Sequence, residues 1–177
     1  MITHRGTEEI RTERMILRRF TMDDATAMFN NWAKEPEVTK YLTWDAHPNI
    51  DHTTWWLSHS MKKYERLDFY YWAIEFEGQV IGCIGGSAVG DNVYDIGYCI
   101  GKKWWNQGIM TEAVKGVINY AFTELNCEFV QLSYILENKA SARVAEKAGM
   151  TFIREEKGGY TKHGIAYDIG YYRIERM

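Results

Sequence analysis

The order of strand and helix patterns along the chain predicts a mixed α/β fold, with a mixed central sheet of about seven strands and helices on both faces. A strand–loop–helix–strand pattern over residues 93–135 indicates a β–α–β crossover, whose two strands are parallel. Hairpin patterns over 70–86 and 150–173 add antiparallel strands on either side of it. The chain has 177 residues and no internal repeat, so we expect a single domain over 1–177.

The first part of the chain combines one strand with three helices. Residues 13–20 form the strand, and Thr21-x-x-Asp24 resembles a capping box that opens a helix through about Trp32. Pro36 suits the first turn of a short second helix. A third helix is expected from about His52 to Arg66, after a polar and aromatic loop over 41–51.

The middle of the chain predicts a glycine-containing hairpin over 70–76 and 80–86, which a strand over 93–100 extends. Apolar residues then recur at helical spacing from about 109 to 125. A strand over 128–135 returns to the sheet.

The last part predicts a short amphipathic helix over 138–149, with Gly149 at the position where helices end. A strand over 150–154, a turn at Gly158-Gly159 and a closing strand over 166–173 follow.

Composition excludes several functional classes. The net charge is −3, from 21 Lys+Arg and 24 Asp+Glu, so no large nucleic-acid footprint is expected. The apolar stretches are too short to span a bilayer and the first residues are polar, so we expect a cytoplasmic protein with no membrane partner. Cys83, Cys99 and Cys127 lack metal-type spacing and the five histidines are scattered, so no metal is expected.

The segment from Lys103 to Ala113 leads from a strand into a helix and is the most informative stretch for function. A helix start leaves backbone N–H groups unpaired and carries partial positive charge, so it attracts anions. Gly108 has no Cβ, which would let phosphates approach the backbone; a glycine serving only as a turn is the alternative. The segment lacks the Gly-Lys-Ser/Thr of a triphosphate loop and the three glycines of a dinucleotide fingerprint.

Four pieces in order carry a resemblance to a family over Thr12 to Arg173. They are TERMILR from Thr12, DIGY from Asp95, QGIMTEA from Gln107, and NKASAR from Asn138 together with Gly149-Met150. The chain resembles the GNAT N-acetyltransferase superfamily and, within it, the RimJ/RimL-like branch. The resemblance implies a sheet splayed between its fourth and fifth strands, and acetyl transfer from acetyl-CoA to an amine.

The resemblance also implies which residues bind acetyl-CoA. The family loop pattern Gln/Arg-x-x-Gly-x-Gly/Ala places Trp105, Gly108 and Met110 at its fixed positions, and only Gly108 matches. Met110 would add bulk beside the pyrophosphate, although backbone N–H groups make most of the contacts. The residues implied are Gln107, Gly108, Ile109, Met110 and Thr111 for the pyrophosphate, Cys99 and Ile100 for the pantetheine arm, and Asn138 and Ser141 beside the thioester, with a helix cap as the alternative role of Asn138. Lys139 and Arg143 could meet the 3′-phosphate, and a solvated helix face is the alternative for these charges.

Transfer to an amine requires an oxyanion donor, a proton for the departing thiolate and a base. We expect the backbone N–H of Cys99 or a neighbour as oxyanion donor, and Ser141 as proton donor unless it only caps a helix. Many members of the resembled family use a tyrosine in the donor role, for which Tyr134 and Tyr160 are weaker candidates.

The remaining catalytic candidates are carboxylates and a thiol. Asp95, Glu75 and Glu37 are possible bases acting through water, and Glu112 is expected to complement the helix dipole. Cys99 could alternatively be a nucleophile, but it lacks a His-Asn/Asp partner pattern.

The acceptor is expected to be a protein or peptide N-terminal amine, because no strong base is evident and α-amines deprotonate at about pH 7.7–8.0, against about 10.4 for lysine. A small-molecule amine (polyamine, antibiotic or amino acid), a catalytically silent acyl-CoA sensor and a partner-binding module are the alternatives. Aromatic residues before the hairpin could line the acceptor site, and a homodimer is expected. These aromatic residues are Tyr41, Trp44, Trp55, Trp56 and Tyr70.

Overall fold

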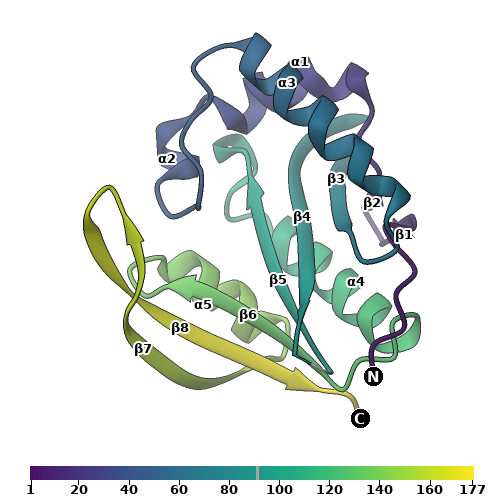
Figure 1. The fold of residues 1–177 in the computed structure, drawn as a ribbon, viewed down its shortest axis with the longest axis vertical. Coiled ribbons are helices and arrows are strands. Elements are labelled where there is room, and N and C mark those ends of the chain that lie inside the picture. Colours follow the sequence, from purple (N-terminus) through teal and green to yellow (C-terminus); the bar gives the residue numbers. More distant parts are fainter. Residues whose placement is uncertain (91) are drawn as a thin grey trace.

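The sheet has eight strands in the order β1-β2-β3-β4-β5-β6-β8-β7 in the computed structural model, which describes residues 1–90 and 92–177 (Figure 1). The predicted mixed sheet is confirmed, with one strand added by a two-residue pairing near the N-terminus. The strands are β1 Ile10–Arg11, β2 Met15–Arg18, β3 Tyr70–Phe76, β4 Gln79–Val89, β5 Val93–Ile100, β6 Phe129–Ile135, β7 Thr151–Lys162 and β8 Ile165–Glu175.

Helices cover both faces of the sheet, as predicted (Figure 1). One face carries α1 Ala25–Met28, α2 Pro36–Thr39 and α3 Ile50–Met61, and the other carries α4 Ile109–Thr123 and α5 Lys139–Lys147. The expected first helix is divided: a 3₁₀ turn over Met22–Asp24 precedes α1 and a π turn over Phe29–Ala33 follows it. The carboxylate of Asp24 accepts from the N–H of Thr21 at 2.8 Å, as a capping box requires.

The splay of the sheet lies between β5 and β6, the fourth and fifth of the predicted strands. Parallel pairing starts at Val93 with Phe129 and stops at Ile96 with Leu132. Beyond this point β5 continues to Ile100 beside β4, while β6 continues to Ile135 beside β8. The two strands therefore separate at their C-terminal ends.

The predicted turn at Gly158-Gly159 is wrong, because both glycines lie inside β7. Gly158 has a φ of 61° where the β7–β8 register is irregular, and its N–H donates to Oδ1 of Asp168 at 2.9 Å. The glycines thus accommodate a bulge rather than a turn. The chain reverses at His163 and Gly164, whose φ values are 51° and 76°.

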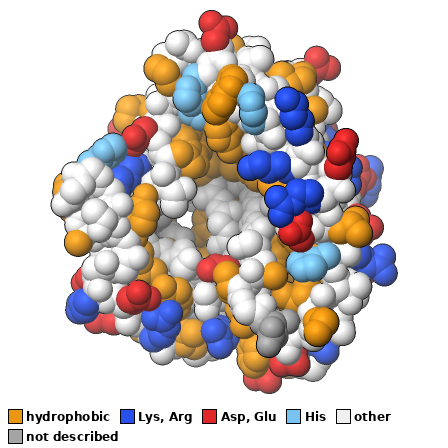
Figure 2. All heavy atoms as spheres, viewed as in Figure 1, with side chains coloured by type: hydrophobic (Ala, Val, Ile, Leu, Met, Phe, Trp, Pro, Cys, Tyr) orange, Lys and Arg blue, Asp and Glu red, His pale blue; other side chains and the backbone are white. Residues whose placement is uncertain are grey.

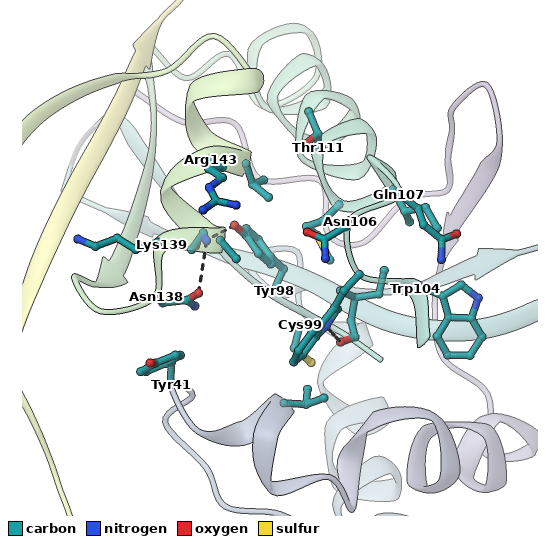
Figure 3. A pocket seen from close by; sticks show the side chains of 18 of the residues that line it. Tyr41, Tyr98, Cys99, Trp104, Asn106, Gln107, Thr111, Asn138, Lys139 and Arg143 are labelled. Carbon is teal, nitrogen blue, oxygen red and sulfur yellow. Dashed lines mark hydrogen bonds between the residues drawn. The ribbon is translucent and has the colours of Figure 1, made fainter. Parts of the chain in front are cut away.

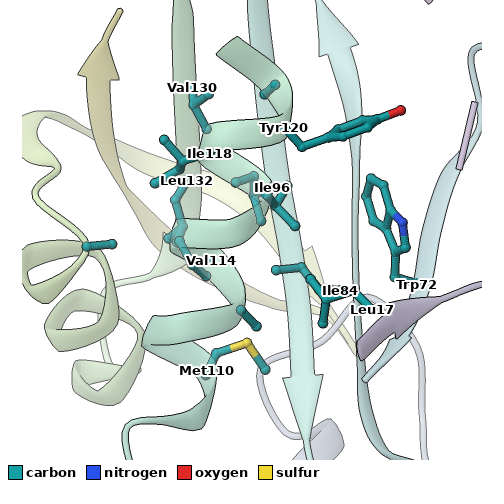
Figure 4. Close-up of a cluster of buried hydrophobic side chains, with 14 of the residues drawn as sticks. Leu17, Trp72, Ile84, Ile96, Met110, Val114, Ile118, Tyr120, Val130 and Leu132 are labelled. Atoms are coloured by element: carbon teal, nitrogen blue, oxygen red, sulfur yellow. The ribbon is translucent and has the colours of Figure 1, made fainter. Parts of the chain in front are cut away.

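Hydrophobic side chains fill the space on both faces of the sheet. On one face, α4 packs Met110, Val114 and Ile118 against Ile96 and Leu132 of the central strands (Figure 4). On the other face, the helices before β3 cover a smaller cluster that includes Trp32, Leu57 and Cys99. In the described residues, no helix is long and apolar enough to cross a membrane.

Candidate active site

A cavity of about 530 Å³ occupies the splay between β5 and β6. Its walls are the end of β5, the loop into α4, the start of α5, and α2 with the loop after it. This volume suits a small-molecule ligand. All eleven residues expected to bind the cofactor line it: Cys99, Ile100, Gln107, Gly108, Ile109, Met110, Thr111, Asn138, Lys139, Ser141 and Arg143.

The start of α4 leaves a backbone donor surface at the cavity. The first helical hydrogen bond runs from the N–H of Glu112 to the carbonyl of Gly108 at 3.1 Å, so the N–H groups of residues 109–111 precede the helical ladder. Gly108 is left-handed, with φ 73°, and a Cβ built there would approach only Nη2 of Arg14, at 3.7 Å. The glycine therefore provides both the turn and open space for an anion.

Contacts from the N-terminal strands hold this loop in place. Arg14 donates from Nη1 to the carbonyl of Gln107 at 3.2 Å and from Nε to Glu112 at 2.6 Å, and the hydroxyl of Thr12 donates to Glu112 at 2.7 Å. Burial opposes ionisation of Glu112, but these hydrogen bonds hold its pKa below the usual range. Besides its place in the first turn of the helix, Glu112 thus ties α4 to the β1–β2 hairpin.

The two residues that depart from the family loop pattern leave the loop backbone accessible. Met110 is 6% exposed and its side chain packs into the core (Figure 4). Trp105 donates from its indole nitrogen to the carbonyl of Ile100 at 2.9 Å. The bulk of Met110 is therefore directed mainly into the protein, although the residue also contributes to the cavity wall.

Basic side chains of α5 form one edge of the cavity. Lys139 and Arg143 contribute to its lining (Figure 3), as does Lys147, and all three are exposed. This edge is electrostatically suited to a phosphate group.

Two hydroxyl groups meet inside the cavity. The phenol oxygen of Tyr98 lies 2.8 Å from Oγ of Ser141, and Ser141 is buried (Figure 3). Asn138, not Ser141, caps α5, since the Asn138 side chain accepts from the backbone N–H of Ser141 at 3.4 Å. Burial raises the pKa of Tyr98 to about 12, against a smaller lowering effect of Ser141, so the phenol is protonated at neutral pH.

Strand register decides which backbone N–H groups face the splay. The N–H of Gly101 donates to Ile81 of β4 at 2.9 Å, and hydrogen-bonding groups alternate along a strand. Cys99 therefore points its N–H toward β4, whereas Tyr98 and Ile100 point theirs toward the splay. This corrects the expected oxyanion donor from Cys99 to one of its neighbours.

The side chain of Cys99 is in a poor setting for a nucleophile. Its sulfur lies 3.4 Å from that of Cys83, and both thiols are buried. The contact with Cys83 and burial raise the pKa of Cys99 well above its usual range. The thiol is therefore protonated at neutral pH, which favours direct transfer over a covalent enzyme intermediate.

Several other candidates lie outside the described lining of the cavity. Asp95 accepts hydrogen bonds from Gln131 and Ser133, both at 3.2 Å, and burial raises its pKa. Glu75 pairs with Arg18, whereas Glu37 does line the cavity and pairs with Lys102. The following residues also lie elsewhere: Trp44, Trp55, Trp56, Tyr70, Tyr134 and Tyr160.

Tyr98 is the functional candidate that the sequence analysis missed. The alternation of β5 gives a usable signal, since Tyr94, Ile96 and Tyr98 share one face of the strand. The decisive contact with Ser141 joins residues 43 positions apart. Tyr41, in the loop after α2, is the one expected acceptor-site aromatic that lines the cavity (Figure 3).

Known proteins share this architecture. The crystal structure of a GNAT-family acetyltransferase from Bacillus anthracis has a TM-score of 0.85 with 24% identity, over 95% of this chain and 98% of that one. RimL, a ribosomal L7/L12 alpha-N-protein acetyltransferase in complex with coenzyme A, has a TM-score of 0.83 with 17% identity, over 95% and 98%. At these identities the likeness concerns the fold.

Sequence comparison extends the likeness to the family. The uncharacterized N-acetyltransferase YoaA of Bacillus subtilis is 27% identical over 169 residues, which are 93% of this chain and 95% of the relative. The Acetyltransferase (GNAT) domain family matches residues 14–151. The chain therefore belongs to the GNAT family of N-acetyltransferases.

Proposed function

We propose that this N-acetyltransferase moves the acetyl group of acetyl-CoA directly to an N-terminal α-amine of a protein or peptide, as in the RimJ/RimL-like branch. The observation that carries the proposal is the pair of Tyr98 and Ser141, which lies in the same cavity as the Gly108 loop. A helix start that suits phosphates and two hydroxyl groups thus border the same cavity.

The residues present suit acetyl-CoA along the whole cavity. The N–H groups at the start of α4 would bind the pyrophosphate, and Lys139 or Arg143 the 3′-phosphate. The backbone groups of Ile100 that face the splay would pair with the pantetheine amides. Asn138 and Ser141 would then lie beside the thioester.

Within this arrangement the amine nitrogen attacks the thioester carbonyl carbon, and the carbon–sulfur bond breaks. The N–H of Tyr98 or Ile100 stabilises the developing oxyanion. Ser141, which is hydrogen-bonded to Tyr98, gives a proton to the departing thiolate. The acceptor nitrogen loses one proton to solvent, and the hydroxyl pair of Ser141 and Tyr98 takes one back from solvent, so the proton count balances.

The preference for an α-amine follows from the acceptor's own acidity. An α-amine with a pKa of about 7.7–8.0 is partly neutral at physiological pH, whereas a lysine amine at about 10.4 needs a base. Of the carboxylates expected as base, Asp95 and Glu75 lie outside the described cavity lining, and Glu37, which does line the cavity, is paired with Lys102. RimL, which acts on an alpha-amine by its description, shares the fold and supports the same choice.

The test is mass spectrometry after incubation with acetyl-CoA and two matched peptides, one with a free N-terminus and one blocked, each containing an internal lysine. We expect acetylation at the free α-amine and little at lysine. Acetylated lysine in both peptides, with the free N-terminus untouched, would reverse the ranking. Binding of acetyl-CoA with no transfer to peptides or to a panel of small amines would instead indicate a sensor.

A further inference from the structure

A single lysine joins two parts of the chain that sequence places far apart. Lys162, at the tip of the β7–β8 hairpin, donates from Nζ to the carbonyls of Thr39 and Leu42 at 2.9 Å and of Trp44 at 3.2 Å. Its Nζ also lies 3.3 Å from the carboxylate of Asp45. The next residue, His163, contacts the same carboxylate at 2.9 Å.

The setting of Lys162 differs from that of an ordinary surface lysine. Its side chain is only 11% exposed, whereas the side chain of Lys157, on the same strand, is 73% exposed. An ammonium group has three donors, and the three carbonyls satisfy all of them. In the described residues, removing this group would leave the carbonyls of Leu42 and Trp44 without a partner, whereas that of Thr39 also accepts from the N–H of Leu42 at 3.0 Å. The contact is therefore specific rather than incidental.

The Lys162 contact lies beside a hollow in the molecule. In Figure 1 the hairpin tip reaches toward α2 and the loop after it, and Figure 2 shows a hollow on the same face. The loop held by Lys162 carries Tyr41 and Leu42, which line the cavity on the side opposite α5. The Gly108 loop, which is expected to bind the phosphates, lies at the other end of the cavity. An amine would therefore enter beside the Lys162 contact.

We propose that Lys162 is a positioning residue for acceptor selection: it latches the β7–β8 hairpin to residues 39–45 and narrows the entrance to slender acceptors such as extended chain ends. This inference rests on the proposed function. The latch, together with the contact between His163 and Asp45, fixes the wall that carries Tyr41, so the amine would be aligned by a wall that long-range contacts hold. A lysine on a folded protein surface would be disfavoured, because the protein around it would meet the rim of this entrance.

The test compares Lys162→Met, which retains the aliphatic stem, with Lys162→Arg and the matched control Lys157→Met. Hydrogen exchange should show lost protection over residues 39–45 in Lys162→Met alone. With a free N-terminal peptide, its KM should rise about tenfold while the acetyl-CoA dissociation constant stays within about twofold. The ratio of lysine to α-amine acetylation on a folded protein acceptor should rise, and Lys162→Arg should restore part of the selectivity.

The possible outcomes separate the two proposals. A folded Lys162→Met variant with wild-type protection over residues 39–45, or with a wild-type KM and acceptor profile, overturns the latch. Loss of protection with the predicted shift toward lysine supports it. Absence of transfer by the wild-type enzyme to any amine overturns the proposed function instead, and is recognised without reference to the variant.

Discussion

The two walls of the cavity are built in different ways. The wall expected to bind the cofactor uses the end of β5, the loop into α4 and the start of α5, and its main donors are backbone groups whose direction follows from local conformation. The opposite wall consists of α2 and residues 39–45, and side chains hold it, above all Lys162 from the distant hairpin. This difference predicts that cofactor binding depends mainly on backbone geometry, whereas acceptor choice depends on a few side-chain contacts.

The largest expected effect concerns the chemistry between the two walls. Ser141→Ala should lower kcat about a hundredfold with a smaller change in KM, because a proton for the thiolate matters chiefly in the transition state. Steady-state kinetics with both substrates would measure it, with Ser58→Ala as the control, whose hydroxyl bonds within α3. A loss of acetyl-CoA binding as large as the loss of kcat would indicate that Ser141 has a structural role.

The second-largest effect is expected at the backbone of the wall that is expected to bind the cofactor. Gly108→Val should weaken acetyl-CoA binding more than tenfold, or about 1.4 kcal/mol, because a β-branched residue strains the left-handed start of α4 and fills the open space beside it. Gly78→Val is a matched control, since Gly78 has the same φ of 73° in the β3–β4 turn. Calorimetry showing equal affinity in both folded variants would contradict the phosphate-loop assignment.

A smaller effect concerns the pH dependence of stability in the segment that follows the opposite wall. Burial and the nearby charge of His52 lower the pKa of His47 to about 4, and His47 shares a 2.8 Å hydrogen bond with Thr53. Between about pH 6.5 and 4 the unfolded chain takes up a proton there that the folded chain does not, so this residue lowers stability as pH falls. His47→Gln should flatten the fall in urea-unfolding free energy over this range.

The exposed His59 of α3 provides the control for that measurement. His59→Gln should retain the wild-type slope. The same slope in His47→Gln as in the wild type would show that His47 titrates as it does in the unfolded chain.

The smallest expected effect lies outside both walls, at the β7 edge of the sheet. β7 is an outer strand, and Phe152 and Ile153 are 45% and 43% exposed, so we propose a homodimer through this edge. Ile153→Lys should shift sedimentation toward monomer, while Trp55→Lys on α3 should leave it unchanged. A wild-type protein that sediments as a monomer would remove the proposal.

The sequence analysis was most successful where function depends on neighbouring residues. The Gly108 junction and the crossover follow from patterns within short segments. The family resemblance implied the splay and the cofactor residues, and those residues all line one cavity. The sequence analysis failed at Gly158-Gly159, because the same glycines can form a turn or a bulge and only the pairing with β8 distinguishes them. It also left the backbone donor open between Cys99 and a neighbour, because the direction of an N–H depends on register with β4.

The sequence by itself therefore determined the order of elements and the helix start that suits an anion. These depend on periodicity and on backbone preferences, which act between residues close in the chain. Only the tertiary structure decided that Tyr98 meets Ser141 and that Lys162 reaches residues 39–45. Such contacts arise because the packed sheet and helices bring distant segments together, and no local pattern records which side chains will meet.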